Sequence, residues 1–224
     1  MTSIANSLPE ATLRRLLSTP RFDTYAHAAQ RAGQQAGAAV TLYAWNARVA
    51  GAMLTPLHLC EIAIRNAVAE ALEIVHGPRW PWVGGFEVSL PNPANAYSPR
   101  QDLTLTRGRF QTTDRVVVEL KFAFWESMFT SRHDNRIWTP HLLKVLPNLS
   151  ASVPVSTHRL QLATDLKAIR LLRNRIAHHE PIFVRNLADD LAKAHAIVDA
   201  RCPATAAWLT SDTTAATTIQ SRPF

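Results

Sequence analysis

Apolar residues recur at three- and four-residue steps along most of the chain, which is the spacing that places them on one face of an α-helix. One such stripe comprises Leu57, Cys60, Ile64, Val68, Ala71 and Val75. The run from Val116 to Val118 could begin a β-strand, but the apolar pattern that follows it is too long and carries no turn signal. The pattern therefore predicts an all-α protein.

Prolines and capping residues set the predicted helix boundaries in the first half of the chain. We expect helices over 7–18 and 22–35, then two long helices, 36–54 and 57–76, hinged at Pro56. Five prolines, with Gly84 and Gly85, predict a proline-rich loop insertion over 77–99. Its aromatic residues could stack on nucleobases, but anchoring in the core is the better interpretation, because the loop needs apolar burial to hold its place. These residues are Trp80, Trp82 and Phe86.

The same signals predict the helices of the second half of the chain. We expect a short helix over 98–108, a buried helix over 112–130, a short helix over 140–146, and long helices over 156–177 and 186–201. Residues 203–224 are rich in Thr and Ala and offer little to bury, so we expect a mostly disordered tail. The chain should thus form one helical domain over 1–202, with its core at about 36–201.

Charge and cysteine content narrow the functional classes. Lys and Arg outnumber Asp and Glu by 24 to 17, which gives a net charge of +7. This surplus suggests a polyanionic partner, most simply nucleic acid, although a basic surface can also serve solubility alone. Cys60 and Cys202 form neither a metal-ligand spacing nor a disulfide framework, which fits a reducing cytoplasm. No signal-peptide pattern and no run of about 18 apolar residues is visible, so we expect no membrane association.

The segment 162–183 concentrates the candidate chemistry on one predicted helix. At about 100° per residue, its apolar residues form a core face and its polar residues form a stripe roughly opposite. The core face holds Leu162, Ile169, Leu172 and Ile176, and the polar stripe holds Lys167, Arg170, Asn174 and His178. Arg173 lies on the flank of the core face, about 140° from His178 on a straight helix. The two can meet only through unwinding near Pro181, through the reach of the arginine, or across a dimer interface.

Other interpretations of this segment involve no catalysis or a different chemistry. Arg175, His178 and His179 could simply oppose the helix macrodipole, because cations stabilise a helix C-terminus. A metal site at His178, His179 and Glu180 is disfavoured, because adjacent histidines on a helix diverge and no second ligand cluster has suitable spacing. A serine hydrolase is disfavoured because the chain carries no Gly-x-Ser-x-Gly motif. We therefore expect no metal and no other cofactor.

Residues 172–180, Leu-Arg-Asn-Arg-Ile-Ala-His-His-Glu, resemble the signature of the Abi-like (abortive infection) branch of the HEPN superfamily. That signature is an arginine, a polar residue and then a histidine after four to six intervening positions. Here four residues separate Arg173 from His178, and the polar residue is Asn174. Residues 42–46, 57–66 and 124–129 resemble the same branch, so the resemblance spans about 42–191.

The resemblance implies an α-helical bundle that dimerises, so that two Arg–His motifs share a cleft, and it implies a metal-independent endoribonuclease. It implies that His178 acts as general base at the ribose 2′-hydroxyl or as acid at the leaving oxygen. Arg173 would stabilise charge on the phosphorane, and Asn174 would orient the histidine or the phosphate. His179 doubles the histidine and leaves open which imidazole acts.

We expect RNA phosphates to be contacted by Lys167, Arg170 and Arg173, with Arg175 in a secondary role. The chain would then act as a toxin or antiviral effector, with an antitoxin or defence-system protein as a further partner. Two alternatives stay open. One is a catalytically silent HEPN module that binds RNA or a partner protein, and the other is a purely structural helical dimer.

Overall fold

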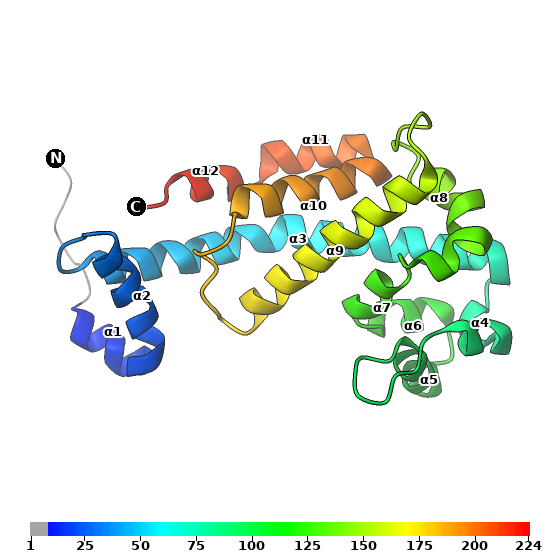
Figure 1. Cartoon of the computed structure of the whole chain (residues 1–224), viewed down its shortest axis with the longest axis horizontal. Helices are drawn as coiled ribbons and strands as arrows, with labels where there is room; N and C mark the ends of the chain where they lie inside the picture. Colours follow the sequence, from blue (N-terminus) through cyan, green and yellow to red (C-terminus); the bar gives the residue numbers. More distant parts are fainter. Residues whose placement is uncertain (1–8) are drawn as a thin grey trace.

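The structure is a computed structural model that describes residues 9–224, and every regular element in this range is helical. The prediction of an all-α protein is therefore confirmed. The long helix α3 (Ala38–His76) runs along the length of the molecule, and the other helices pack beside it (Figure 1). The predicted start of the first helix at residue 7 lies outside the described residues.

The predicted hinge at Pro56 is wrong, because α3 continues through this residue as one helix of 39 residues. An interior proline removes one backbone hydrogen bond and costs about 3 kcal/mol. Pro56 is itself buried, and its neighbours Met53 and Leu57 lie in the core. Burying such side chains is worth roughly 1.5–3 kcal/mol each. Packing of this face therefore outweighs the lost hydrogen bond.

α3 is also long and apolar enough to cross a membrane by length and composition, with an 18-residue window of mean hydropathy 1.2. A core helix passes the same test. Buried residues recur along α3 from Ala39 to Leu72, and α2, α10 and α12 pack against it. The apolar stretch is therefore weak evidence for a membrane span.

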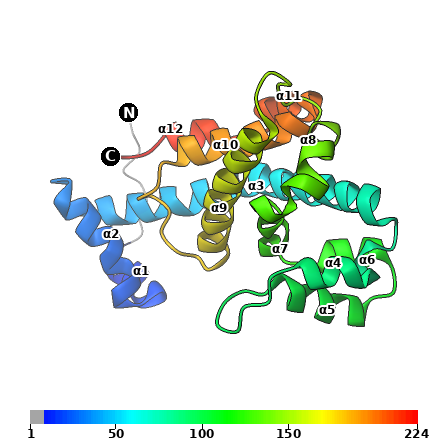
Figure 2. The ribbon, with the colours of Figure 1, turned by 45° about the vertical axis from the view of Figure 1, so that its right-hand side comes forward.

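Two helices cover the N-terminal end of α3, α1 (Glu10–Leu17) and α2 (Thr19–Arg31). Short helices gather under its other end, as Figures 1 and 2 show. The predicted proline-rich loop is interrupted there by η1 (Trp80–Trp82) and α4 (Gly84–Ser89). Trp80 and Phe86 are buried, and their rings meet edge to face. The interpretation that they anchor this segment is confirmed.

The single buried helix predicted over 112–130 is wrong, because α6 (Thr113–Glu119) and α7 (Phe122–Ser127) are separate helices. Leu120 and Lys121 between them are extended. The cause lies in α5 (Pro99–Arg109), which begins after Ser98 as predicted. Its buried Asp102 carboxylate accepts a hydrogen bond from the backbone N–H of Lys121 at 3.3 Å. A side chain from another helix thus takes a donor that a continuous helix would use itself.

The helices of the C-terminal half begin and end close to their predicted residues. After the short turns η2 (Ser131–His133) and η3 (Asp134–Trp138), the chain forms α8 (Thr139–Val145), α9 (Val155–Ala177) and α10 (Leu187–Arg201). The Asn186 side chain caps α10 by accepting the Asp189 backbone N–H. α9 and α10 both pack against α3, and α9 crosses the near side of the molecule in Figure 1.

The predicted disorder of residues 203–224 is contradicted by two helices, α11 (Pro203–Asp212) and α12 (Ala215–Gln220). α11 packs on α10, and α12 packs on α3 and α10. Leu209 and Ala215 are fully buried, and the Thr218 carbonyl accepts the Trp45 indole N–H at 2.7 Å. The Ala and Thr side chains that suggested disorder are small enough to let these helices approach closely.

Candidate functional site

α9 orients the candidate residues as its helical geometry predicts. All four residues of the expected core face are buried, and Lys167 and His178 on the opposite stripe are exposed. Arg170 and Asn174 on that stripe are half-buried. The amphipathic division of this helix is confirmed, and it makes the outer face of α9 accessible.

Arg170, Arg173 and Asn174 line a groove of about 380 Å³ between α9, α3 and the α6–α7 junction. Arg170 is ion-paired with Glu126 and is half-buried. The Arg173 guanidinium lies 3.6 Å from the Glu61 carboxylate, and its side chain is 44% exposed. Such an exposed pair is worth about 0–1 kcal/mol. Arg173 therefore remains available to a phosphate, whereas Arg170 is engaged within the protein.

α9 ends in a Schellman-type turn that gives the two histidines different conformations. His178 is the C-cap residue, and His179 has a φ of 55°, in the left-handed region. The backbone N–H groups of His179 and Glu180 donate to the carbonyls of Ile176 and Arg175, at 3.0 and 2.8 Å. α9 stays regular up to this turn. Unwinding before His178 is therefore not how Arg173 and His178 come together.

Arg175 braces the turn that follows α9. Its Nε and Nη2 donate to the carbonyl oxygen of Pro181 at 3.2 and 2.7 Å. Its guanidinium also lies 3.6 Å from the Glu180 carboxylate. These contacts occupy the group that the sequence suggested as a secondary RNA contact, and they favour a structural role for it.

His179 and Glu180 line a second cavity, of about 440 Å³, between α2, α3 and the end of α9. The Arg21 guanidinium from α2 closes one side by donating to the His179 carbonyl oxygen at 2.8 Å. Tyr25 and Tyr43 supply aromatic surface. His178 lines neither this cavity nor the groove at Arg173. A single chain thus does not bring Arg173 and His178 into one cavity.

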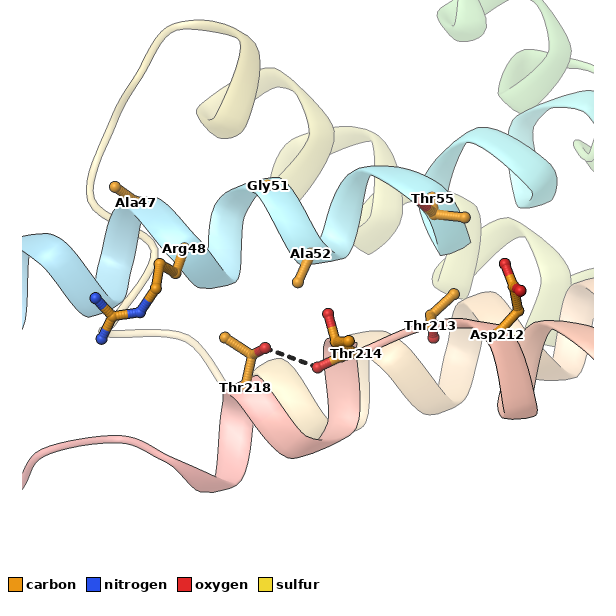
Figure 3. A pocket seen from close by; sticks show the side chains of 9 residues that line it. All are labelled: Ala47, Arg48, Gly51, Ala52, Thr55, Asp212, Thr213, Thr214 and Thr218. Carbon is orange, nitrogen blue, oxygen red and sulfur yellow. Dashed lines mark hydrogen bonds between the residues drawn. The ribbon is translucent and has the colours of Figure 1, made fainter.

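A third groove, of about 530 Å³, lies between α3 and the α11–α12 junction, as Figure 3 shows. Threonine hydroxyls dominate its wall, and the Thr218 hydroxyl donates to the Thr214 carbonyl oxygen at 2.7 Å. None of the candidate residues from α9 lines it. Within residues 9–224, no group of three His, Cys, Asp or Glu side chains is placed to hold a metal ion.

The sequence offered no role for Arg21 and Tyr43, which line these cavities, and it suggested for Glu61 a surface pair with Arg65, whereas Glu61 lies against Arg173. Asn46 is the clearest case, because its Oδ1 accepts the backbone N–H groups of Ile182 and Phe183 at 2.8 and 3.1 Å. This buried contact ties the segment after α9 to α3. Tyr43, Asn46 and Glu61 lie in segments noted for their family resemblance, which was the one signal available for them.

No family model, no curated protein and no solved structure matches the chain. The functional signal therefore comes from the chain's own residues, namely the signature-like segment at the end of α9 and the accessible face of this helix.

Proposed function

We propose that the chain is a metal-independent endoribonuclease of the HEPN type that works as a homodimer through α9. The observation that carries the proposal is a continuous stripe on the accessible face of this helix. Its residues are separated alternately by four and three positions: Leu160, Thr164, Lys167, Leu171, Asn174 and His178. Leu160 and Leu171 are 60% and 43% exposed. Exposed leucines at this spacing are typical of a face that packs against another helix.

A regular α9 keeps Arg173 and His178 of one chain apart. A two-fold dimer through this stripe can bring Arg173 of one subunit near His178 of the other. A two-fold interface uses the same surface on both subunits. If two antiparallel α9 helices cross midway between residues 173 and 178, Arg173 of one subunit lies level with His178 of the partner subunit, and the long arginine side chain reaches around its own helix to meet it. Each dimer then holds two such pairs beside one another. The net charge of +7 favours the approach of a polyanion to this cleft.

The proposed reaction needs no metal-activated water, because RNA supplies its own nucleophile. The ribose 2′-oxygen attacks the adjacent phosphorus, and the 5′-oxygen of the next nucleotide leaves. His178 accepts the proton of the 2′-hydroxyl or donates one to the leaving oxygen. Arg173 binds the phosphate oxygens, which a planar guanidinium can contact at two points. Asn174 orients the phosphate or the histidine, and Lys167 adds a phosphate contact.

The test is cleavage of total RNA in the presence of EDTA by the native chain and its variants. His178→Ala should lower the rate by roughly 10²- to 10⁴-fold, which is the contribution of a positioned acid or base. Its fold and RNA affinity should stay nearly unchanged. His179→Ala should lose less, and Arg173→Lys should stay well below the native rate. Native-rate cleavage by the double variant His178→Ala, His179→Ala would remove the assignment.

One observation favours the alternative of a catalytically silent HEPN module that binds RNA or a partner protein. Arg170 is paired with Glu126, and Arg175 is bound to the Pro181 carbonyl, so two expected RNA contacts are engaged within the chain. In the same assay, RNA that is retarded on a gel but stays intact would support this module. The role as a cytoplasmic toxin or antiviral effector, with an antitoxin or defence-system partner, belongs to the nuclease proposal.

A further inference from the structure

We propose that the cavity between α2, α3 and the end of α9 is a pocket for an unstacked nucleobase of a single RNA strand. The inference rests on the proposed function, because it places a base beside the ribose on which His178 would act. The residue that directly follows this proposed acid or base, His179, lines the pocket. Most of its other lining residues belong to α2 and α3, which are far from His179 in the sequence.

The volume and apolar lining of the cavity suit a flat ring. Its volume of about 440 Å³ lies within the range of about 300–1,000 Å³ found for ligand pockets. Leu17, Leu54 and Ile176 supply aliphatic walls. The rings of Tyr25 and Tyr43 meet edge to face, with centroids 5.3 Å apart. Tyr25 is buried, so the half-buried Tyr43 ring is the surface on which a single-stranded base can stack, as bases do on aromatic side chains in other proteins.

The pocket is also lined by polar groups that can form hydrogen bonds with a ligand. Asn46 lines the cavity and uses its Oδ1 to accept two backbone N–H groups, so its amide nitrogen, Nδ2, is the group left to donate. Among the described residues, neither this amide nitrogen nor the hydroxyls of Tyr25 and Tyr43 have a hydrogen-bond partner. Burial raises the pKa of Tyr25 to about 12, so its hydroxyl stays a donor at neutral pH. Polar groups in such places are normally satisfied by a ligand, water or protein.

These two properties together select the ligand class. An aliphatic ligand would leave the amide and hydroxyl donors without partners, and a bare phosphate would not cover the apolar walls. A nucleobase satisfies both, because it has an apolar face and a polar edge. Guanine matches best. The Glu180 carboxylate, which forms a half-exposed pair with Arg175 at 3.6 Å, can accept from its N1–H and N2–H groups, and Arg21 can donate a second N–H group to its O6 while it holds the His179 carbonyl oxygen.

The test compares two leucine substitutions on the same helix. Ala50 lines the proposed pocket, whereas Ala52 lines the groove on the side of α3 that faces Thr214 and Thr218 (Figure 3). The probes are a guanosine-containing 2′-O-methyl hexanucleotide, which 2′-oxygen attack cannot cleave, and an abasic strand with the same phosphates. The native chain should bind the base-containing strand about tenfold more tightly. Ala50→Leu should abolish this preference, and the control Ala52→Leu should keep it.

Equal affinity of the native chain for the two strands, or a preference that survives Ala50→Leu, would overturn the pocket. If Ala50→Leu does not fold, Glu180→Gln tests the same site from an exposed position. It should weaken binding of the guanosine strand about tenfold and leave an adenosine strand unaffected; unchanged guanosine binding contradicts the proposal. Because the strands cannot be cleaved, their affinity is measured independently of catalysis. A chain that cleaves RNA without base-dependent binding keeps the nuclease assignment and loses the pocket.

Discussion

His179 is the residue at which backbone conformation and candidate chemistry meet. Its left-handed φ of 55° is needed to close the turn after α9, a place where glycine is usual. A non-glycine residue in this region costs on the order of 1–3 kcal/mol. The surrounding contacts hold it there, since Arg21 binds its carbonyl oxygen and Glu180 completes the turn. Such strain recurs at functional sites, which makes this residue informative for the catalytic hypothesis.

At this scale we predict that His179→Gly stabilises the chain by about 1 kcal/mol, because glycine adopts the left-handed conformation without strain. Its RNA cleavage should fall far less than that of His178→Ala. Urea unfolding followed by circular dichroism measures the first effect. His179→Ala is the matched control, since it removes the imidazole but keeps the strain. A glycine variant less stable than the native chain would mean that the imidazole itself stabilises the fold.

At the scale of elements, the break between α6 and α7 depends on one carboxylate. Asp102 accepts the Lys121 backbone N–H and, at 2.6 Å, the Tyr97 hydroxyl. The Lys121 ammonium lies 3.8 Å from the same carboxylate. The break also shapes the groove that holds Arg173, because Lys121 lines it together with residues of α9. A single buried acid thus contacts Lys121 both at the helix boundary and beside the candidate site.

We therefore predict that Asp102→Ala destabilises the chain by about 1–3 kcal/mol, because it removes the acceptor of two part-buried hydrogen bonds. Tyr97→Phe, which removes one of these hydrogen bonds, should cost about 1 kcal/mol. Thermal and urea unfolding of both variants measure the difference. A loss below about 0.5 kcal/mol for Asp102→Ala, typical of an exposed position, would contradict the assigned role.

At the scale of the whole molecule, the exposed face of α9 is the surface on which the proposed activity depends. We predict that Leu171→Glu turns a dimer into a monomer at micromolar concentration and abolishes cleavage, because it places a charge in the apolar stripe. Its unfolding free energy per chain should change little, since Leu171 is 43% exposed. Light scattering and the cleavage assay measure both effects. Val184→Glu, at an exposed apolar residue off the stripe, is the control.

A native chain that scatters as a monomer at this concentration would contradict the dimer. The same holds if monomeric Leu171→Glu cleaves RNA at the native rate. In either case the Arg173 and His178 side chains would have to act from one chain, which a regular α9 does not favour.

Local signals along the chain were sufficient for much of this architecture. The apolar period predicted an all-α protein and the buried face of α9, and capping residues such as Ser98 and Asn186 marked where α5 and α10 begin. The exposure of Lys167 and His178 also followed from helical geometry. These properties depend on residues a few positions apart, so the spacing within a helix suffices to predict them.

Contacts between residues far apart in the sequence decided the features of the fold and the candidate site that local signals did not predict. Burial along the core carries α3 through Pro56, Asp102 separates α6 from α7, and the Trp45 indole helps to hold the C-terminal helices in place. Ion pairing of Arg170 with Glu126 and the cavity behind His179 likewise join segments far apart in the sequence. At Pro56 and at the α6–α7 break, tertiary packing or a hydrogen bond outweighs a local preference of about 1–3 kcal/mol. Such contacts leave no periodic trace in the chain, because the partners meet only once it has folded.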